Sequence, residues 1–234
     1  MSGLAIAGTS LVDQAVRRVR DHIRTNSLRA GDWLPGESKF AAELGVSRAV
    51  IREAFGALAA LRQIDVANGR RAKVAAIDGT VMGTSLDHAV ATAQISVAEV
   101  WDVRRTLELR TAELAARHRS DGDARLIAHL AMSMANERDD LAAMTQHDIA
   151  FHQAIAQSSG NALFLQIVRS FEELMRIAVP AAWQTRTTVD QRETILHHHQ
   201  AIAHAIGDRD PIAATEAMSA HFDASIGNLM RHGF

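Results

Sequence analysis

The sequence predicts a mainly α-helical protein with two domains, one over residues 1–76 and one over residues 77–234. Apolar residues recur at helical spacing along most of the chain, and the one strong β-hairpin pattern lies within the first 76 residues. The charges divide at the same place. Residues 1–76 carry 12 Lys and Arg against 7 Asp and Glu, while the remainder carries 13 against 20. A basic first domain on an acidic body indicates that the first domain meets a polyanion.

The composition excludes several classes of site and protein. The chain contains no cysteine, so disulfides, thiolate metal sites and a cysteine nucleophile are ruled out, and a metal must have nitrogen and oxygen ligands. The N-terminal residues lack the basic and apolar regions of a signal peptide, and no later segment is apolar enough to span a membrane. We therefore expect a soluble, cytoplasmic protein with no membrane partner.

The first domain begins with a pattern typical of a helix-turn-helix. Ser10 and Ser47 fit the N-caps of two helices, and Gly45 fits the left-handed residue that ends a helix between them. Two β-prone runs then flank Asn68-Gly69, a pair that favours a tight type I′ hairpin turn. This order of elements is that of a winged helix-turn-helix. The expected elements are helices over 11–26, 37–44 and 48–61, a short strand at 33–34, and hairpin strands over 64–67 and 70–74.

The third of these helices carries the candidate DNA-contacting residues. In a helix-turn-helix its first residues meet base edges in the major groove. Arg48 and Arg52 are four residues apart and share one helix face, so both guanidinium groups can bind guanine O6 and N7. Ala49 is small enough for close approach, and Arg70, Arg71 and Lys73 follow on the wing. The alternative is that both arginines only solvate an exposed face.

Residues 29–74 resemble the GntR family of bacterial regulators, through Gly31-Asp32, Leu34-Pro35, the Leu44–Arg48 turn and Arg52-Glu53-Ala54. Three departures concern Ser38, where the family has a DNA-reading arginine, Arg62, where it has glycine, and a wing of different sequence. Arg62 costs about 1 kcal/mol if its φ is positive. Lys39, beside Ser38, is a candidate substitute for the missing arginine. The DNA-contacting residues that the resemblance implies are Lys39, Ser47, Arg48, Ala49, Val50, Arg52, Asn68, Gly69 and Arg70.

The second domain is predicted to be an antiparallel bundle of six or seven helices. Helical periodicity is broken at Ser96, at Asp121-Gly122, at 158–161, at Pro180 and at 208–211. The expected helices cover 83–93, 96–119, 121–139, 142–158, 161–179, 190–207 and 210–231.

Histidines fall on the apolar faces of three of these helices. Asp148 and His152 are four residues apart on one face, and His199 and His221 each lie in an apolar stripe of helical period. A lone histidine in such a stripe is usually a hydrogen-bonded core residue. Three that converge with an aspartate favour a site for Zn²⁺, Ni²⁺ or another first-row divalent ion.

Residues 80–230 resemble the ligand-binding FCD domain of the FadR branch of the GntR family. The matching residues are Asp148-x-x-x-His152, Ser159-Gly160-Asn161, His199-x-x-Ile202 and His221. The resemblance implies metal ligands at Asp148, His152, His199 and His221, and effector contacts at Arg104 and Asn161. For Arg104, a pair with Glu108 within the same helix is an equal alternative.

Together these features predict a non-enzymatic transcriptional regulator, a repressor, that senses a small organic acid through a divalent metal ion, Zn²⁺ or Ni²⁺. We expect a homodimer bound to a pseudo-palindromic double-stranded operator, because one such domain reads only a short half-site. Three alternatives remain: regulation by the metal itself, a metal-dependent hydrolase, and histidines that are purely structural.

Overall fold

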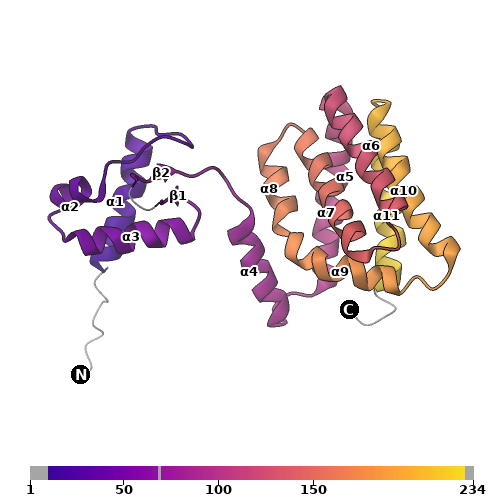
Figure 1. Ribbon diagram of the computed structural model, residues 1–234, viewed down its shortest axis with the longest axis horizontal. Helices are drawn as coiled ribbons and strands as arrows, with labels where there is room; N and C mark the ends of the chain where they lie inside the picture. The colour runs from indigo at the N-terminus through magenta and orange to yellow at the C-terminus, as the bar shows by residue number, and fades with distance from the viewer. Residues whose placement is uncertain (1–9, 68–69, 230–234) are drawn as a thin grey trace, which may run out of the picture. The chain divides into compact units, whose positions relative to one another are not determined.

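The computed structural model describes residues 10–67 and 70–229, with backbone only for 226–229. The chain divides into two compact units, Met1–Asp78 and Gly79–Phe234 (Figure 1). In the described part of the chain no helix is long and apolar enough to cross a membrane.

The first unit is a winged helix-turn-helix. Ser10 and Ser47 cap helices as expected, with their hydroxyl oxygens accepting from the backbone N–H of Asp13 and Val50. Gly45 ends the middle helix in the left-handed region, at φ +64°. The helices are α1 (Leu11–Thr25), α2 (Glu37–Leu44) and α3 (Arg48–Ala60).

The wing is a shorter hairpin than the sequence predicted. Strands β1 (Ile64–Asp65) and β2 (Lys73–Val74) pair antiparallel, with Asp65 opposite Lys73, and Trp33 forms an isolated bridge to Lys73. Residues 66–67 and 70–72 therefore lie outside the two strands, and the expected strands over 64–67 and 70–74 are too long. The N–H of Arg70 donates to the carbonyl of Ala67 at 3.1 Å. Asn68 and Gly69 themselves lie outside the described residues.

The core of the first unit is built on one face of α3. Ile51, Phe55 and Leu58 are buried there, together with Val19 of α1 and Phe40 of α2. The opposite face of α3 is left to solvent, which is what a DNA-contacting helix requires.

Arg62 follows α3 with a left-handed backbone, at φ +53°. A side chain in this region costs about 1–2 kcal/mol because Cβ crowds the next carbonyl oxygen. The expected strain at this position is therefore present.

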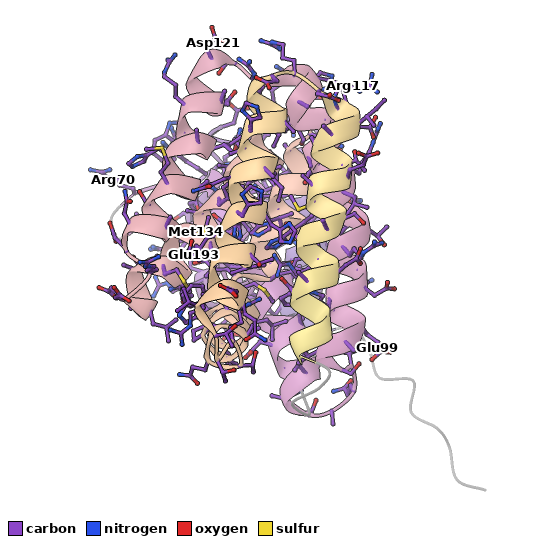
Figure 2. All side chains as sticks on the ribbon, turned by 90° about the vertical axis from the view of Figure 1, so that its right-hand side faces the viewer. Arg70, Glu99, Arg117, Asp121, Met134 and Glu193 are labelled. Atoms are coloured by element: carbon purple, nitrogen blue, oxygen red, sulfur yellow. The ribbon has the colours of Figure 1, made fainter. Side chains whose placement is uncertain are left out.

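The second unit is a helical bundle in which α5 packs against α7 and α11, and α6 packs against α7 and α10 (Figure 1). Capping boxes begin three of its helices, at Ser96 with Glu99, Ser120 with Asp123, and Thr188 with Gln191. Figure 2 shows Arg117 and Asp121 at one end of the bundle and Glu99 at the other. The helices are α4 (Thr80–Ala91), α5 (Val97–His118), α6 (Asp121–Asn136), α7 (Leu141–Ser158), α8 (Ala162–Ser170), α9 (Glu172–Gln184), α10 (Val189–Gly207) and α11 (Pro211–Leu229).

The described residues of this unit thus form eight helices, where six or seven were expected. The segment 161–179, predicted as one helix, is divided at Phe171 into α8 and α9. Pro180 was expected to end a helix but lies inside α9. A proline removes one backbone hydrogen bond, and the burial of Ala178, Ala182 and Trp183 around it offsets that loss.

Helix α4 is held against α8 by a close backbone contact. The N–H of Gly79 donates to the side-chain oxygen of Gln166 at 3.0 Å. A Cβ at Gly79 would lie 2.3 Å from the carbonyl oxygen of Gln166, and one at Gly83 would lie 2.9 Å from that of Ser170. Only glycine permits this approach at either position.

Candidate DNA-contacting surface and metal centre

The start of α3 presents most of the residues expected to contact DNA. Ser47, Arg48, Ala49 and Arg52 are exposed, whereas Val50 is half-buried and packs against the core. The hydroxyl of Ser47 is engaged as the helix cap, and Arg52 lies 3.5 Å from a carboxylate oxygen of Glu37. That ion pair is exposed and weak, so Arg52 can exchange it for a base or a phosphate.

The other basic residues that were predicted to contact DNA lie on α2 and on the wing. Lys39 is exposed on α2, with Glu43 3.8 Å away, and Arg70 is exposed on the wing. Trp33 was not expected to take part, but the Lys73 ammonium lies 4.2 Å and the Arg71 guanidinium carbon 5.6 Å from the centre of its ring. Cation–π contacts of this kind fix the position of both positive charges.

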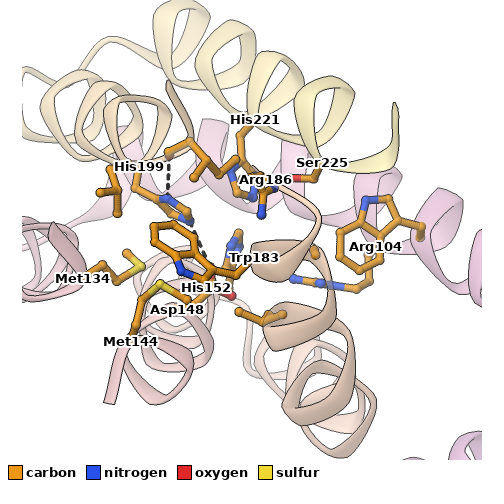
Figure 3. Close-up of a pocket in the computed structure, with 15 residues that line it drawn as sticks. Arg104, Met134, Met144, Asp148, His152, Trp183, Arg186, His199, His221 and Ser225 are labelled. Atoms are coloured by element: carbon orange, nitrogen blue, oxygen red, sulfur yellow. Dashed lines mark hydrogen bonds and ion pairs between the residues drawn. The ribbon is translucent and has the colours of Figure 1, made fainter. Parts of the chain in front are cut away.

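The second unit contains a cavity of about 40 Å³ between its helices. A volume of this size has room for only a few water-sized groups. Figure 3 shows the charged and imidazole side chains converging on it. The lining residues are Trp101 and Arg104 of α5, Met134 of α6, Met144, Asp148 and His152 of α7, Val179, Ala182 and Trp183 of α9, Arg186 of the connection between α9 and α10, Ile195, Leu196 and His199 of α10, and His221 and Ser225 of α11.

Three of the four predicted metal ligands form a compact cluster in this cavity. His152, His199 and His221 are all buried, and each offers one ring nitrogen within 4.8 Å of the other two. The ring centres of His199 and His221 are 4.5 Å apart. Nitrogens that bind one ion lie about 2 Å from it and so at most about 4 Å apart, and small side-chain movements would bring the three rings to that spacing.

Asp148 joins the cluster through an unusual contact with His199. The Nδ1 of His199 lies 2.9 Å from the carbonyl oxygen of Ile195, where it donates a hydrogen bond. Its Nε2 then carries the lone pair when the ring is neutral, yet Nε2 lies 3.1 Å from a carboxylate oxygen of Asp148. Two acceptors face each other, and a cation or an additional proton between them is required. The four side chains therefore fit a metal ion.

The charge states of these groups also suit a metal. Burial by itself would raise the pKa of Asp148, but the neighbouring His199, His152 and Arg104 outweigh it and hold the pKa at about 2. Burial lowers the pKa of His221 well below 6.5, and the neighbouring His199 and His152 lower it further. An ionised carboxylate and a neutral imidazole are the forms that bind metals.

Glu108 is a buried participant that the sequence analysis did not assign to the site. One of its carboxylate oxygens accepts from Nε of Arg104 at 2.7 Å, and the other contacts Nδ1 of His152. Burial raises the pKa of Glu108, but Arg104 and His152 more than compensate and lower it overall. With Nδ1 held by Glu108, Nε2 of His152 is left as its metal-binding atom, as in carboxylate–histidine–zinc arrangements.

The two predicted effector contacts differ in their outcome. Arg104 lines the cavity as expected, and it also forms the pair with Glu108 that was its alternative interpretation. Asn161 does not line the cavity: it is exposed, and its side-chain oxygen caps α8 by accepting from the N–H of Leu163. The structure therefore does not bring Asn161 together with the other predicted site residues, because a residue that begins α8 directs its amide to that helix terminus.

Two residues of the site were missed: Arg186, which lines the cavity, and Glu108, which contacts the lining residues Arg104 and His152. Glu108 lies on the helical stripe that contains Trp101 and Arg104, so periodicity could have predicted its burial. Arg186 lies between α9 and α10, where no periodicity applies, and is buried in the cavity.

Comparisons with known proteins agree with this architecture. The model of the gntR family of bacterial regulatory proteins matches residues 11–74, and the FCD domain model matches residues 99–224. The putative L-lactate dehydrogenase operon regulatory protein of Escherichia coli K12 is 32% identical over 219 residues, which are 90% of this chain and 83% of that protein.

Two other relatives and one solved structure are similar. The Glc operon transcriptional activator of E. coli K12 is 31% identical over 86% of this chain and 82% of its own. The transcriptional repressor NanR of Citrobacter rodentium is 28% identical over 94% and 85%. A Streptococcus agalactiae GntR structure shares the fold, with a TM-score of 0.66, 24% identity, and coverage of 91% of this chain and 97% of that one. The chain therefore belongs to the GntR family of bacterial transcriptional regulators and carries an FCD domain.

Proposed function

We propose that this regulator senses a small organic acid through a divalent metal ion bound by Asp148, His152, His199 and His221. The observation that carries the proposal is the buried pair of facing acceptors, Nε2 of His199 and the carboxylate of Asp148, beside two more imidazoles. Three nitrogen ligands and one oxygen ligand suit Zn²⁺ or Ni²⁺ and leave coordination positions open for an acid. When bound, the ion would supply a positive charge that binds a carboxylate oxygen.

The size of the cavity supports a compact effector. With a volume of about 40 Å³, it accepts a molecule of a few heavy atoms without large rearrangement. One relative is named as the regulator of an L-lactate dehydrogenase operon, which concerns a three-carbon hydroxy acid. We therefore favour hydroxy or keto acids of two to four carbons as effectors.

The first unit would bind the operator DNA. The exposed arginines at the start of α3 favour binding in the major groove, and two copies of the unit in a homodimer would match the halves of a pseudo-palindromic operator. We propose that the effector releases the protein from DNA. It can do so only if it binds the DNA-free form more tightly than the DNA-bound form.

Metal analysis of protein purified without a histidine tag tests the first step. We expect one Zn²⁺ or Ni²⁺ per chain, and loss of the metal in His199→Asn. A matched control is His204→Asn, because His204 lies on the same helix but is exposed and outside the cavity. Equal metal content in the two variants contradicts the proposed ligand set.

Operator binding with and without acid tests the second step. Metal-loaded wild-type protein should release its operator when a C2–C4 hydroxy or keto acid is added, and a ligand at 100 times its Kd should also stabilise the protein by about 2.7 kcal/mol. Operator binding that follows metal concentration and ignores every acid would instead identify a direct metal sensor.

A further inference from the structure

The cavity contains two buried arginines, and their surroundings differ. Arg104 is enclosed: its Nε donates to Glu108 at 2.7 Å, its guanidinium carbon lies 5.0 Å from the ring centre of Trp101 and 5.5 Å from that of Phe222, and it contacts the sulfur of Met175. Its charge is already balanced by a buried carboxylate at bonding distance. A ligand would have to displace Glu108 in order to bind this guanidinium bidentately.

Arg186 has no such partner. Its side chain is buried, with the residue only 5% exposed, and it lines the cavity beside the metal-ligand cluster. Within the described residues no carboxylate lies within ion-pair distance of its guanidinium. Burial lowers the pKa of Arg186, and the charge of Asp148 offsets only part of that effect. A buried guanidinium without a paired anion is costly, and a bound anion would remove that cost.

The backbone around Arg186 is held in place from two sides. Its N–H donates to the carbonyl of Trp183 at 3.1 Å, and its own carbonyl accepts from Nε of Arg192 at 3.0 Å. The guanidinium of Arg192 also lies over the Trp183 ring, 5.4 Å from its centre. The connection between α9 and α10 therefore presents Arg186 in a fixed position, as a preorganised binding group requires.

The balance of buried charge indicates what Arg186 binds. Two buried guanidiniums, Arg104 and Arg186, offset two buried carboxylates, Glu108 and Asp148. A divalent ion bound by Asp148 would neutralise the negative charge of that carboxylate. The cavity would then carry an excess of positive charge beside Arg186. A small anion that touches both the ion and Arg186 neutralises that excess.

We propose that Arg186, and not Arg104, binds the carboxylate of the effector, so that a small acid bridges this guanidinium and the metal ion. This inference rests on the proposed function, because it assumes an acid effector and a metal at the histidine cluster. Arg104 instead positions Glu108, and through it His152.

The test uses the full-length, zinc-loaded protein and titration calorimetry with glycolate, L-lactate, oxalate and malonate. For the acid that binds the wild type, Arg186→Gln should raise Kd at least about 30-fold, since a buried charge-assisted pair is lost. Arg186→Lys should give an intermediate Kd, because it keeps the charge without the two-pronged geometry. Arg104→Lys, which retains a cation for Glu108, tests the alternative assignment of the carboxylate to Arg104.

Two further measurements separate this role from a structural one. Zinc affinity, measured by competition with a chelator, should be unchanged or higher in Arg186→Gln, because a positive charge near the ion has been removed. Arg176→Gln is the matched control: Arg176 lies on α9 but is exposed and paired with Glu172, and its variant should bind acid like the wild type.

Each outcome decides the proposal. An acid affinity in Arg186→Gln within threefold of the wild type, at full zinc content, overturns the role of Arg186 and leaves the proposed function intact. A large loss in Arg104→Lys with none in Arg186→Gln assigns the carboxylate to Arg104 instead. If the zinc-loaded wild type binds none of the acids, both the inference and the proposed function fail.

Discussion

Replacing Arg104 by methionine should destabilise the helical unit strongly. Arg104 and Glu108 are 3% and 1% exposed, and removing one partner of such a buried pair costs about 3–5 kcal/mol because the other charge stays buried. In a unit of this size, each kcal/mol lowers the melting temperature by about 2–4 °C. We therefore expect Arg104→Met to melt about 6–20 °C below the wild type.

Circular dichroism melting in chelator-containing buffer measures this effect without a contribution from metal binding. Arg110→Met is the matched control, because Arg110 lies on the same helix and pairs with Glu113, but its side chain is 52% exposed. Exposed pairs contribute about 0.2–1 kcal/mol, so the control should lose no more than about 4 °C. The double variant Arg104→Met/Glu108→Gln removes both charges and should recover part of the lost stability. If Arg104→Met melts at the same temperature as the control, an unpaired Glu108 carries no large cost and the reasoning is refuted.

Three other predictions concern single positions. Arg62→Gly should stabilise the first unit by about 1 kcal/mol, measured by urea unfolding, because φ is +53° at this position; a destabilised variant contradicts this. Arg48→Ala should weaken operator binding by about 1–3 kcal/mol in a fluorescence-anisotropy titration at fixed salt, whereas Arg24→Ala, exposed on α1, should not. In the folded, metal-free protein the pKa of His221 lies well below 6.5, so the ring stays neutral at pH values where the unfolded chain protonates it. The free energy of unfolding should therefore fall as the pH drops below 6.5, by up to about 1.4 kcal/mol per pH unit. His221→Gln should reduce this slope, and an equal slope in the variant refutes the assignment.

Periodic segments of the second unit could be predicted well from the sequence. The apolar stripes around His199 and His221 predicted buried faces, and both histidines are buried. The same rule explains why Asp148 and His152 lie together, since residues four apart share a helix face. On packed helices, the spacing of apolar residues along the chain is enough to predict which side chains are buried.

Features that depend on contacts between distant segments could not be predicted in this way. Arg186 lies in a connection, and its burial depends on the helices that enclose it. Pro180 is kept inside a helix by tertiary packing, against its local preference. Asn161 was placed by resemblance, which carries a position along the chain but not the direction in which a side chain points.

The glycine contact between α4 and α8 brings the two backbones together with no side chain from α4 at Gly79 and Gly83. A shift of α8 at this point has no flexible atoms to absorb it, so it must be passed on to the beginning of α4. Gly79 directly follows Asp78, the last residue of the first unit. A movement of α8 can thus be passed to the peptide that directly follows the first unit.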